Sequence, residues 1–481
     1  MKEKNRDKRT RKSSQNREFA VVAYSFLAIF VLLMGYLIYF QAALSEQFIN
    51  NPYNKRQELF EQQVVRGSIS TADGVVVAET LTGADGAEVR HYPYDNMFAH
   101  VVGYSNHGKT GIEALENFHL LRSNVSAAEK VIEDLQAVKN RGDNVVTTLS
   151  FDLQKAAYEA IGVYRGAVVV MEPATGKILA MVSKPDYNPN TIVEDWSLLT
   201  AEDNDKSQLL NRATQGLYPP GSTFKILTTL EYLAEHPDYQ NYQYHCSGVL
   251  TVDNNVIHCY ANTRHGQEDL MSSFAHSCNT SYASLGLDLD IGRFGELCGS
   301  MLFNSSLPLP LEYKQSSFVL KEGDSAADIM ETSIGQGKTL VTPFHMALIT
   351  CAIANDGMLM KPYVIDHIEN ANQGLVEQYR SAEYRQLLKT EDAAVMQEFL
   401  KNVVQEGTGR KFKDASYEVA GKTGSAEYHT GSDSSHSWFV GYAHMDGKED
   451  IAVAVLAERA GSGSEYALPI AKEIFDSYYK E

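Results

Sequence analysis

The stretch YPPGSTFKILT at residues 218–228 decides how the rest of the sequence is interpreted. It places a serine and a lysine three residues apart, Ser222 and Lys225, directly after two prolines and a glycine. The Pro-Pro-Gly turn ends the preceding chain and predicts a helix that starts at Ser222, so the serine is expected at the positive end of the helix dipole. Because residues three apart share one face of a helix, Lys225 is expected within reach of the Ser222 hydroxyl.

Two further short elements follow in order along the chain. Ser277-Cys278-Asn279 lies in AHSCNTSY, and Lys422-Thr423-Gly424 lies in VAGKTGSAEY. The order Ser-x-x-Lys, Ser-x-Asn, Lys-Thr-Gly is typical of penicillin-binding proteins and active-site-serine β-lactamases. The trio predicts acyl-transfer chemistry on Ser222.

Each residue of the trio has a physical reason to be there. A serine hydroxyl is a poor nucleophile until a base removes its proton, and a lysine is that base only when burial and nearby cations lower its pKa. Lys422 is expected to supply such a neighbouring charge. Ser277 is expected to relay the proton toward the departing amine, and Asn279 to hydrogen-bond the peptide backbone of the substrate.

The last element is expected to hold the other end of the substrate. Lys422 and Thr423, on an edge strand, are predicted to bind a terminal carboxylate. Backbone amides at Ser222 and Ser425 are predicted to form the oxyanion hole, and Gly424 is expected to allow close approach of the substrate backbone.

The chain also holds imitations of these motifs, so no element is specific alone. Residues 477–480 are a second Ser-x-x-Lys, residues 14–16 a second Ser-x-Asn and residues 109–111 a second Lys-Thr-Gly. GYSNHGKT at 103–110 also matches the phosphate-loop pattern of nucleotide-binding proteins. The first three imitations lie in the wrong place or order. The fourth lacks a metal-binding aspartate strand, so we interpret it as a glycine-rich turn.

The N-terminus predicts a membrane anchor. Residues 1–17 carry eight Lys and Arg against two acids, and Phe19 to Phe40 runs without a charge, which is long enough to span a bilayer. Because the next basic residue is Lys55, the N-terminus is expected in the cytoplasm and everything after Phe40 outside. A cleaved signal peptide is the competing interpretation, but no Ala-x-Ala site follows the apolar run.

The charge balance excludes one class of partner. The formal charge of the whole chain is -19, although the first seventeen residues alone are basic. A strongly acidic external portion disfavours nucleic-acid binding.

The five cysteines divide into a pair and three isolated residues. Cys246 and Cys259 flank DNN, a good hairpin turn, so a disulfide and two free thiols both stay open. His245 and His258 adjoin the pair, but neighbouring strand residues point to opposite faces, which disfavours a zinc site made of these four. We expect no metal and no cofactor. The remaining three are interpreted as buried, inert thiols: Cys278, Cys298 and Cys351.

The pattern of apolar residues predicts an α+β fold. About a hundred residues of short alternating runs follow the anchor, and from Asn144 strands and helices are longer. Strands are expected in GAVVVMEPATGKILAMVS and near the C-terminus, with helices between them. The predicted division is a cytoplasmic tail (1–17), an anchor (18–43), a small non-catalytic pedestal (44–143) and a catalytic domain (144–481).

With these residues the chain resembles the class B penicillin-binding proteins, monofunctional D,D-transpeptidases of the penicillin-binding protein A and FtsI type. NRATQGLYPPGSTFK, SIGQGKTLVTPFHMA, IANDG and QEGTGRKF add to the resemblance. It implies an antiparallel sheet covered by helices, acylation of Ser222 by peptidoglycan stem peptides of lipid-linked nascent glycan, and acylation by β-lactams. It also implies a partner, the polytopic glycan polymerase of the shape, elongation, division and sporulation family.

Two positions depart from the family pattern. Thr71 and Ala72 replace Asp-Arg in RGSISTADG, which puts the pedestal contacts of those charges in doubt, and Ser425 replaces the threonine after Lys-Thr-Gly. Three alternatives use parts of the same architecture. They are a membrane-anchored β-lactamase, a β-lactam sensor, and a non-catalytic scaffold that activates a polymerase.

Overall fold

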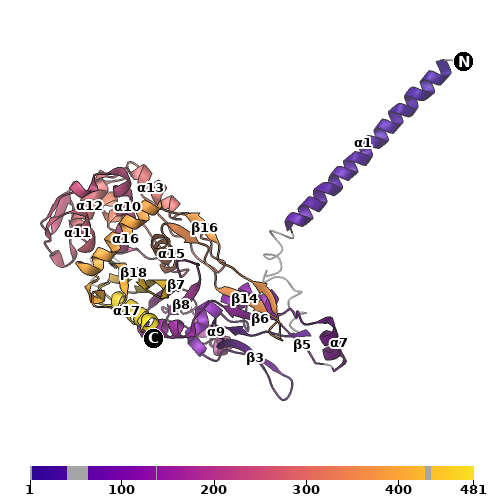
Figure 1. Cartoon of the computed structure of the whole chain (residues 1–481), viewed down its shortest axis with the longest axis horizontal. Helices are drawn as coiled ribbons and strands as arrows, with labels where there is room; N and C mark the ends of the chain where they lie inside the picture. Colours follow the sequence, from indigo (N-terminus) through magenta and orange to yellow (C-terminus); the bar gives the residue numbers. More distant parts are fainter. Residues whose placement is uncertain (1–2, 41–62, 137, 428–434, 481) are drawn as a thin grey trace. The chain divides into compact units, whose positions relative to one another are not determined.

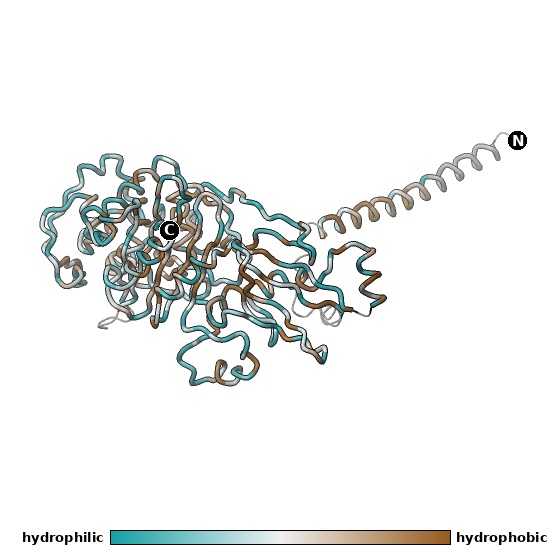
Figure 2. Tube along the Cα trace, turned by 60° about the horizontal axis from the view of Figure 1, so that its bottom comes forward, coloured by the Kyte–Doolittle hydropathy of each residue, from teal (hydrophilic) through white to brown (hydrophobic). Residues whose placement is uncertain are grey.

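A computed structural model describes residues 3–40, 63–136, 138–427 and 435–480 (Figure 1). The chain forms two units, residues 1–59 and 60–481, which are described separately. Helix α1 (Glu3–Tyr39) belongs to the first, and among the described residues only its segment Phe19–Tyr39 is long and apolar enough to cross a membrane. Most side chains of this segment are exposed, and the tube in Figure 2 is predominantly brown along it. The helix therefore indicates a single-pass membrane anchor.

The larger part of the second unit is built on a five-stranded antiparallel sheet. Its strand order is β17-β18-β19-β7-β8, which leaves β17 at an edge, as the sequence predicted for the Lys-Thr-Gly element. The strands are β7 (Gly166–Met171), β8 (Ile178–Lys184), β17 (Glu418–Glu427), β18 (Ser435–Met445) and β19 (Lys448–Ala457).

Helices bury both faces of this sheet. Val169 of β7 belongs to the apolar cluster that includes α15 (Pro343–Ala354), whereas its neighbour Val170 belongs to the cluster of α8 (Phe151–Ile161) and α17 (Ala467–Tyr479). Successive side chains of a strand point to opposite faces, so a strand covered on both sides needs an uninterrupted apolar run. This explains GAVVVM, and the predicted strand pairs and terminal helix are confirmed.

A helical layer carries the segments that follow the Ser-x-x-Lys stretch. Figure 1 shows α10 to α13 and α16 gathered at one end of the second unit. The helices are α10 (Lys225–Glu235), α11 (Leu270–Ala275), α12 (Asn279–Asp288), α13 (Ile291–Ser300), α14 (Ala326–Ser333) and α16 (Thr390–Gln405). Helix α9 (Ile192–Leu199) precedes the Ser-x-x-Lys stretch and lies apart from this layer.

Two short strand pairs lie beside α12. The pair β10 (Val249–Val252) and β11 (Asn255–His258) forms the predicted hairpin, and Asp253 and Asn254 take the positive φ angles that a tight two-residue turn needs. β9 (Tyr244–Cys246) pairs with β12 (Gly266–Glu268). The residues between β11 and β12 are thereby held close to β9.

A six-stranded mixed sheet forms the pedestal and includes strands from the C-terminal side of the predicted boundary. Its order is β15-β14-β6-β2-β3-β4. Four strands come from the N-terminal half and two follow α15. They are β2 (Ile69–Ser70), β3 (Val76–Thr82), β4 (Glu88–His91), β6 (Asn144–Thr147), β14 (Ile365–Glu369) and β15 (Leu375–Gln378).

Smaller elements complete the pedestal and its connection. Two further short strand pairs are present, β1 with β5 and β13 with β16. The remaining elements are β1 (Val64–Val65), α4 (Ala99–Val102), α5 (Gly111–Leu115), α6 (Asn117–Leu120), α7 (Ala127–Leu135), β5 (Asn140–Arg141), β13 (Met358–Met360) and β16 (Glu383–Gln386).

The GYSNHGKT segment is a turn between two short helices of this module. Gly103, Gly108 and Gly111 all have positive φ, and a Cβ on Gly111 would lie 2.6 Å from the carbonyl oxygen of Val101. The helix that follows, α5, has only five residues. A phosphate loop opens a longer helix whose N-terminus binds the anion, so the interpretation as a turn fits this geometry.

Charged contacts in the pedestal are present, but at positions other than the substituted pair. The Glu113 carboxylate is fully buried and accepts from Arg66 Nε at 2.7 Å and from Arg90 Nε at 2.7 Å. Burial favours the protonated acid, yet both guanidinium groups outweigh it and hold the pKa of Glu113 below its ordinary value. Thr71 is buried without a charge and its hydroxyl bonds the backbone of Val75.

Replacing Glu113 by glutamine is expected to destabilise the protein by about 3–5 kcal/mol, because two buried guanidinium groups lose their counter-charge. Chemical denaturation of the full chain in detergent, followed by the loss of near-ultraviolet circular dichroism, measures this. Glu88→Gln is the matched control, since Glu88 pairs with Lys139 at the surface and such pairs contribute under about 1 kcal/mol. Equal effects of both substitutions would contradict the assignment.

Candidate active site

The residues of the three motifs meet at one cleft. Its volume is about 830 Å³, in the range of small-molecule sites. The side chains that line it come from several stretches that are separated along the sequence. The lining includes Ser222, Ser277, Asn279, Thr423, Gly424 and Ser425. The structure therefore brings together six of the eight residues predicted for catalysis and substrate binding, and it places Lys225 and Lys422 in the protein interior beside them.

Ser222 lies in a 3₁₀ turn, Gly221–Phe224, and the α-helix α10 begins only at Lys225. The expectation that the α-helix starts at Ser222 is thus off by three residues. The turn is pressed against β17, because a Cβ on Gly221 would lie 2.8 Å from the Ser425 carbonyl oxygen. Gly221 also has a positive φ of 55°, a second reason for glycine.

Gly424 makes the same close approach from the other side. A Cβ there would lie 3.0 Å from Thr223 Cγ2 and 3.2 Å from the Pro220 carbonyl oxygen. We expected this glycine to make room for the substrate backbone, but the space beside it is occupied by the turn that carries Ser222. Gly221 and Gly424 therefore set the distance between the Ser222 turn and the edge strand.

The Lys225 ammonium is held by the Ser-x-Asn segment. Its Nζ donates to the Ser277 carbonyl oxygen at 2.8 Å and to Asn279 Oδ1 at 2.8 Å, and it lies 3.3 Å from Ser277 Oγ. Its side chain is fully buried. Burial lowers the pKa of Lys225 to about 7, against a smaller opposing effect of the Cys278 and Cys259 thiols. A substantial neutral fraction is then present near neutral pH, as a proton acceptor requires.

Ser277 and Asn279 are positioned by an unusual backbone. Ser277 has a φ of 59°, which is uncommon for a residue other than glycine and is frequent at functional sites. Asn279 begins α12, and its Nδ2 donates to the His258 carbonyl oxygen at 3.0 Å. One lone pair and one N–H of the Asn279 amide stay available for a substrate, because protein groups use the others.

Lys422 lies behind the cleft, and its neighbour Thr423 faces into it. The Lys422 side chain is fully buried, and burial followed by the charge of Lys225 lowers its pKa well below the ordinary value. Its Nζ donates to the Thr423 carbonyl oxygen at 3.1 Å. The charge effect between the two lysines is that of Lys225 on Lys422, so the expected role of Lys422 as a neighbouring charge for Lys225 stays a prediction. The groups at the surface of the cleft that could bind a carboxylate are the hydroxyls of Thr408, Thr423 and Ser425, and the Lys422 ammonium lies behind them.

Acylation of Ser222 is expected to accelerate about tenfold from about pH 6 to about pH 8, because Lys225 accepts a proton only when neutral and its pKa is about 7. Stopped-flow labelling with a fluorescent penicillin across this range measures the rate constant. Lys422→Met removes a neighbouring charge and is expected to shift the profile to higher pH. A flat profile would contradict the role of Lys225, and a profile that does not move in Lys422→Met would contradict the role of Lys422 as a neighbouring charge.

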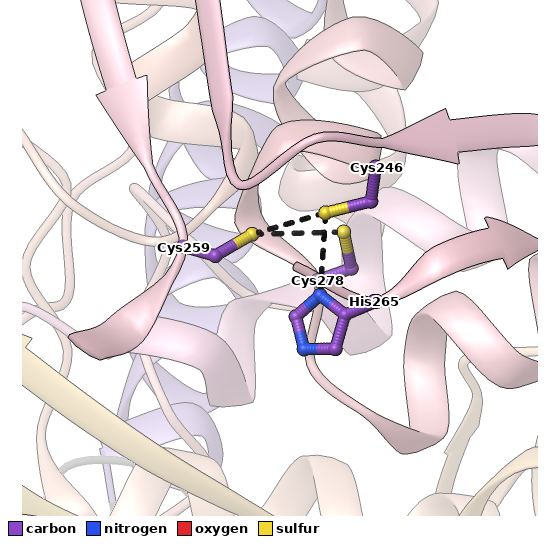
Figure 3. Close-up of side chains that lie close together, drawn as sticks. All are labelled: Cys246, Cys259, His265 and Cys278. Atoms are coloured by element: carbon purple, nitrogen blue, oxygen red, sulfur yellow. Dashed lines mark hydrogen bonds between the residues drawn. The ribbon is translucent and has the colours of Figure 1, made fainter. Parts of the chain in front are cut away.

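The two paired cysteines do approach each other, but the structure records no disulfide. Cys246 Sγ and Cys259 Sγ are 3.6 Å apart, and all five cysteines are free thiols. The histidine beside the sulfurs is His265, whose Nδ1 lies 3.4 Å from Cys246 Sγ, and neither His245 nor His258 belongs to this group. Cys278 is buried as expected but not isolated, because its sulfur lies 3.8 Å from Cys259 Sγ (Figure 3).

Several cleft residues were not singled out from the sequence. Thr408 Oγ1 lies 2.6 Å from Thr423 Oγ1, and Gln336 Nε2 lies 3.5 Å from the Ser425 carbonyl oxygen. Both fall in stretches that carry the family resemblance, QEGTGRKF and SIGQGKTLVTPFHMA, so this resemblance was the available signal. No pattern in the sequence indicates that His265 lies at the cleft, because its position depends on the pairing of β9 with β12.

The arrangement defines a class of protein. A serine at the mouth of a cleft, a buried lysine whose pKa is near neutral, and a second hydroxyl bonded to that lysine are the parts of a serine acyltransferase. No metal is needed for this chemistry. Neighbouring amides at Ser222 and Ser425 would meet the negative charge that develops on a carbonyl oxygen.

Comparison with known proteins gives the family. Residues 166–478 match the penicillin binding protein transpeptidase domain, and residues 66–145 match the penicillin binding protein A dimerisation domain. The chain belongs to the penicillin-binding protein transpeptidase family. The second match lies within the part that the sequence predicted as a pedestal, apart from its last two residues.

Individual relatives agree over nearly the whole length. The chain is 29% identical over 496 residues to the peptidoglycan D,D-transpeptidase PbpA of Mycolicibacterium smegmatis, which covers 97% of this chain and 99% of the relative. It resembles the imipenem acyl-enzyme complex of penicillin-binding protein A from M. tuberculosis, at 28% identity and a TM-score of 0.78, over 87% and 99% of the two chains. For the D,D-transpeptidase domain of a peptidoglycan glycosyltransferase from Eggerthella lenta the values are 30%, 0.77, 87% and 99%.

Proposed function

We propose that this chain is a membrane-anchored peptidoglycan D,D-transpeptidase in which Ser222 is the nucleophile. Its donor substrate is a stem peptide that ends in D-alanyl-D-alanine, and β-lactams acylate the same serine. The observation that carries the proposal is the buried Lys225 ammonium, held by Ser277 and Asn279 at the cleft that Ser222 lines. Assignments to the individual residues follow from this contact.

The reaction proceeds through an acyl-enzyme. Neutral Lys225 accepts the Ser222 proton while Oγ attacks the carbonyl carbon of the penultimate D-alanine, and the amides of Ser222 and Ser425 stabilise the oxyanion. Ser277, 3.3 Å from Lys225 Nζ, passes the proton to the nitrogen of the departing D-alanine. The C–N bond then breaks. An amine of a neighbouring stem attacks the ester carbonyl and gives a proton to Lys225. The new C–N bond forms, the C–O bond to Ser222 breaks, and Lys225 returns the proton to Ser222 Oγ.

The far side of the cleft binds the terminal carboxylate. Thr423, Thr408 and Ser425 present hydroxyl groups there, and the first two are hydrogen-bonded to each other. Lys422 lies beneath them and adds positive potential in its protonated form, which a carboxylate favours. Asn279 holds the substrate backbone with its remaining N–H and lone pair.

A fluorescent penicillin tests the function on the full chain purified in detergent. A stable label supports the transpeptidase if a synthetic stem peptide also releases D-alanine. The acyl group of that peptide should then be transferred to an added amine. Rapid turnover of the label would instead identify a β-lactamase. Absence of label in a correctly folded protein would identify a scaffold.

The topology and the division of the chain are part of the proposal. Residues 1–17 form a cytoplasmic tail, 18–43 the anchor and 44–143 most of the pedestal. Residues 144–481 form the catalytic domain on the outer face of the bacterial membrane, and they also give the pedestal sheet its strands β6, β14 and β15. The basic tail and the uncharged segment after it support this orientation. Protease protection in sealed right-side-out vesicles tests it, since the catalytic domain should be digested and the tail protected.

The partner we propose is the polytopic glycan polymerase of the shape, elongation, division and sporulation family. We expect the anchor and the pedestal to carry this contact, because the anchor is long and apolar enough to enter the membrane. Co-purification of the full chain with that polymerase is expected to depend on residues 1–143. Retention of binding by a chain that lacks the pedestal and anchor would contradict it.

A further inference from the structure

Four side chains converge beside the cleft in a way that acyl transfer does not use. Cys246 ends β9, Cys259 follows β11, His265 precedes β12, and Cys278 lies just before α12. One ligand atom from each lies within 4.8 Å of all the others. Figure 3 shows the three sulfurs and the His265 ring directed toward a common point. The three cysteine side chains are at most 2% exposed.

The spacing of these atoms is that of a tetrahedral metal site. A Zn–S bond of about 2.3 Å and a Zn–N bond of about 2.0–2.1 Å imply S···S separations of about 3.8 Å and S···N separations of about 3.6 Å in a tetrahedron. Cys246 and Cys259 sulfurs are 3.6 Å apart, Cys259 and Cys278 sulfurs 3.8 Å, and His265 Nδ1 is 3.4 Å from Cys246 Sγ. We propose that Cys246, Cys259, His265 and Cys278 bind one zinc ion.

The surroundings supply the hydrogen bonds that metal-bound thiolates need. Thr280 Oγ1 donates to Cys246 Sγ at 3.3 Å and lies 3.6 Å from Cys259 Sγ and 3.4 Å from Cys278 Sγ. The Thr280 hydroxyl thus lies close to all three sulfurs, and its one proton is directed to Cys246 Sγ.

The ligand set selects the metal and its role. Three thiolates and one imidazole favour zinc over Mg²⁺ or Ca²⁺, which prefer oxygen ligands. Four protein ligands complete a tetrahedron and leave no open position for water or substrate, as in structural zinc sites. The two interpretations left open from the sequence, a disulfide and two free thiols, considered Cys246 and Cys259 alone. The structure adds the Cys278 sulfur and the His265 imidazole to this pair, both at metal-ligand spacing.

The ion would hold the catalytic segment in place. Cys278 stands between Ser277 and Asn279, the two residues that bind Lys225. Cys259 follows His258, whose carbonyl oxygen accepts the Asn279 amide. The metal would therefore tie the β11–β12 connection to the start of α12 and fix both ends of the contact that positions Lys225. Cys246, Cys259, His265 and Cys278 are positioning residues in this account.

Metal analysis of the full chain tests the site. Elemental analysis of protein purified without added metal is expected to find about one zinc per chain. Cys259→Ser and His265→Ala should lose most of it, whereas Cys298→Ala and Cys351→Ala, at buried cysteines outside the cluster, should keep it. Cobalt exchanged into the site should show the thiolate-to-metal and d–d absorption bands of tetrahedral sulfur coordination, which does not depend on any variant folding.

Two results would overturn the metal site. One is wild-type protein without a transition metal in which Cys246, Cys259 and Cys278 all react as free thiols on denaturation. The other is an intact mass and peptide map that show a Cys246–Cys259 disulfide. Ser222→Ala should retain its zinc, so the metal content tests the site independently of the proposed enzyme activity.

The positioning role has its own measurement. Removing the metal with a strong chelator is expected to lower the acylation rate constant about 10–100-fold, the usual cost of disturbing a supporting shell, with a smaller change in the dissociation constant of the β-lactam. Added zinc should restore the rate and added magnesium should not. A metal-free protein that stays folded and acylates at the full rate would refute the positioning role.

Discussion

Ser222→Ala is expected to lower covalent labelling by a fluorescent penicillin at least about 10⁴-fold, because the acyl-enzyme has no other oxygen on which to form. The side chain lies at the surface of the cleft, in a turn held by backbone contacts at Gly221 and Gly424. The substitution removes only a hydroxyl group, so the fold and the melting temperature should not change. Mass spectrometry of the intact chain after incubation with penicillin gives the fraction acylated.

The chain contains its own control for this experiment. Ser477 and Lys480 repeat the Ser-x-x-Lys pattern within α17 and just after it, where no Ser-x-Asn or Lys-Thr-Gly element follows. Ser477→Ala should label at the wild-type rate. Residual labelling of Ser222→Ala, at a serine identified by peptide mapping, would show that the nucleophile lies elsewhere.

Lys225→Met is expected to lower the acylation rate constant about 10²–10⁴-fold, the usual contribution of a positioned general base. Methionine is close to lysine in length and carries no proton acceptor, so the buried position stays filled. Lys225 donates to Ser277 and Asn279, and these groups then lose a partner, which lowers the melting temperature modestly. Stopped-flow labelling separates the rate constant from the affinity for penicillin.

The rate should also lose its dependence on pH in this variant, since the group that titrates is gone. Lys480→Met is the matched control and should keep both the rate and the profile, because Lys480 pairs with Asp476 at the surface. A Lys225→Met enzyme with the wild-type pH profile would assign the base to another residue.

Local patterns in the sequence predicted much of the fold and of the cleft. The apolar runs around Val169 and Val453 placed two of the sheet strands, and the DNN turn placed the β10–β11 hairpin. The order of the three motifs placed Ser222, Ser277 and Thr423 at one cleft. Each of these depends on neighbours in sequence or on the family pattern, which is why sequence alone was sufficient.

What the sequence did not predict depends on contacts between distant segments. Cys278 was interpreted as an inert thiol because its own surroundings are apolar, yet β9, β11 and β12 bring two more sulfurs and His265 to it. Gly424 was assigned to the substrate, although the Ser222 turn fills the space beside it. In both cases the neighbour lies more than ten residues away in sequence, beyond the reach of any local pattern.

The pairing of β6 with β14 affects the order in which the chain can fold. Val145 pairs with Ile368, so the pedestal sheet gains its fifth and sixth strands from residues made more than two hundred positions after the fourth. Closing such a long loop is slow and follows local folding. During synthesis the pedestal sheet therefore stays incomplete, and the edge of β6 stays unpaired, until most of the catalytic domain has been made.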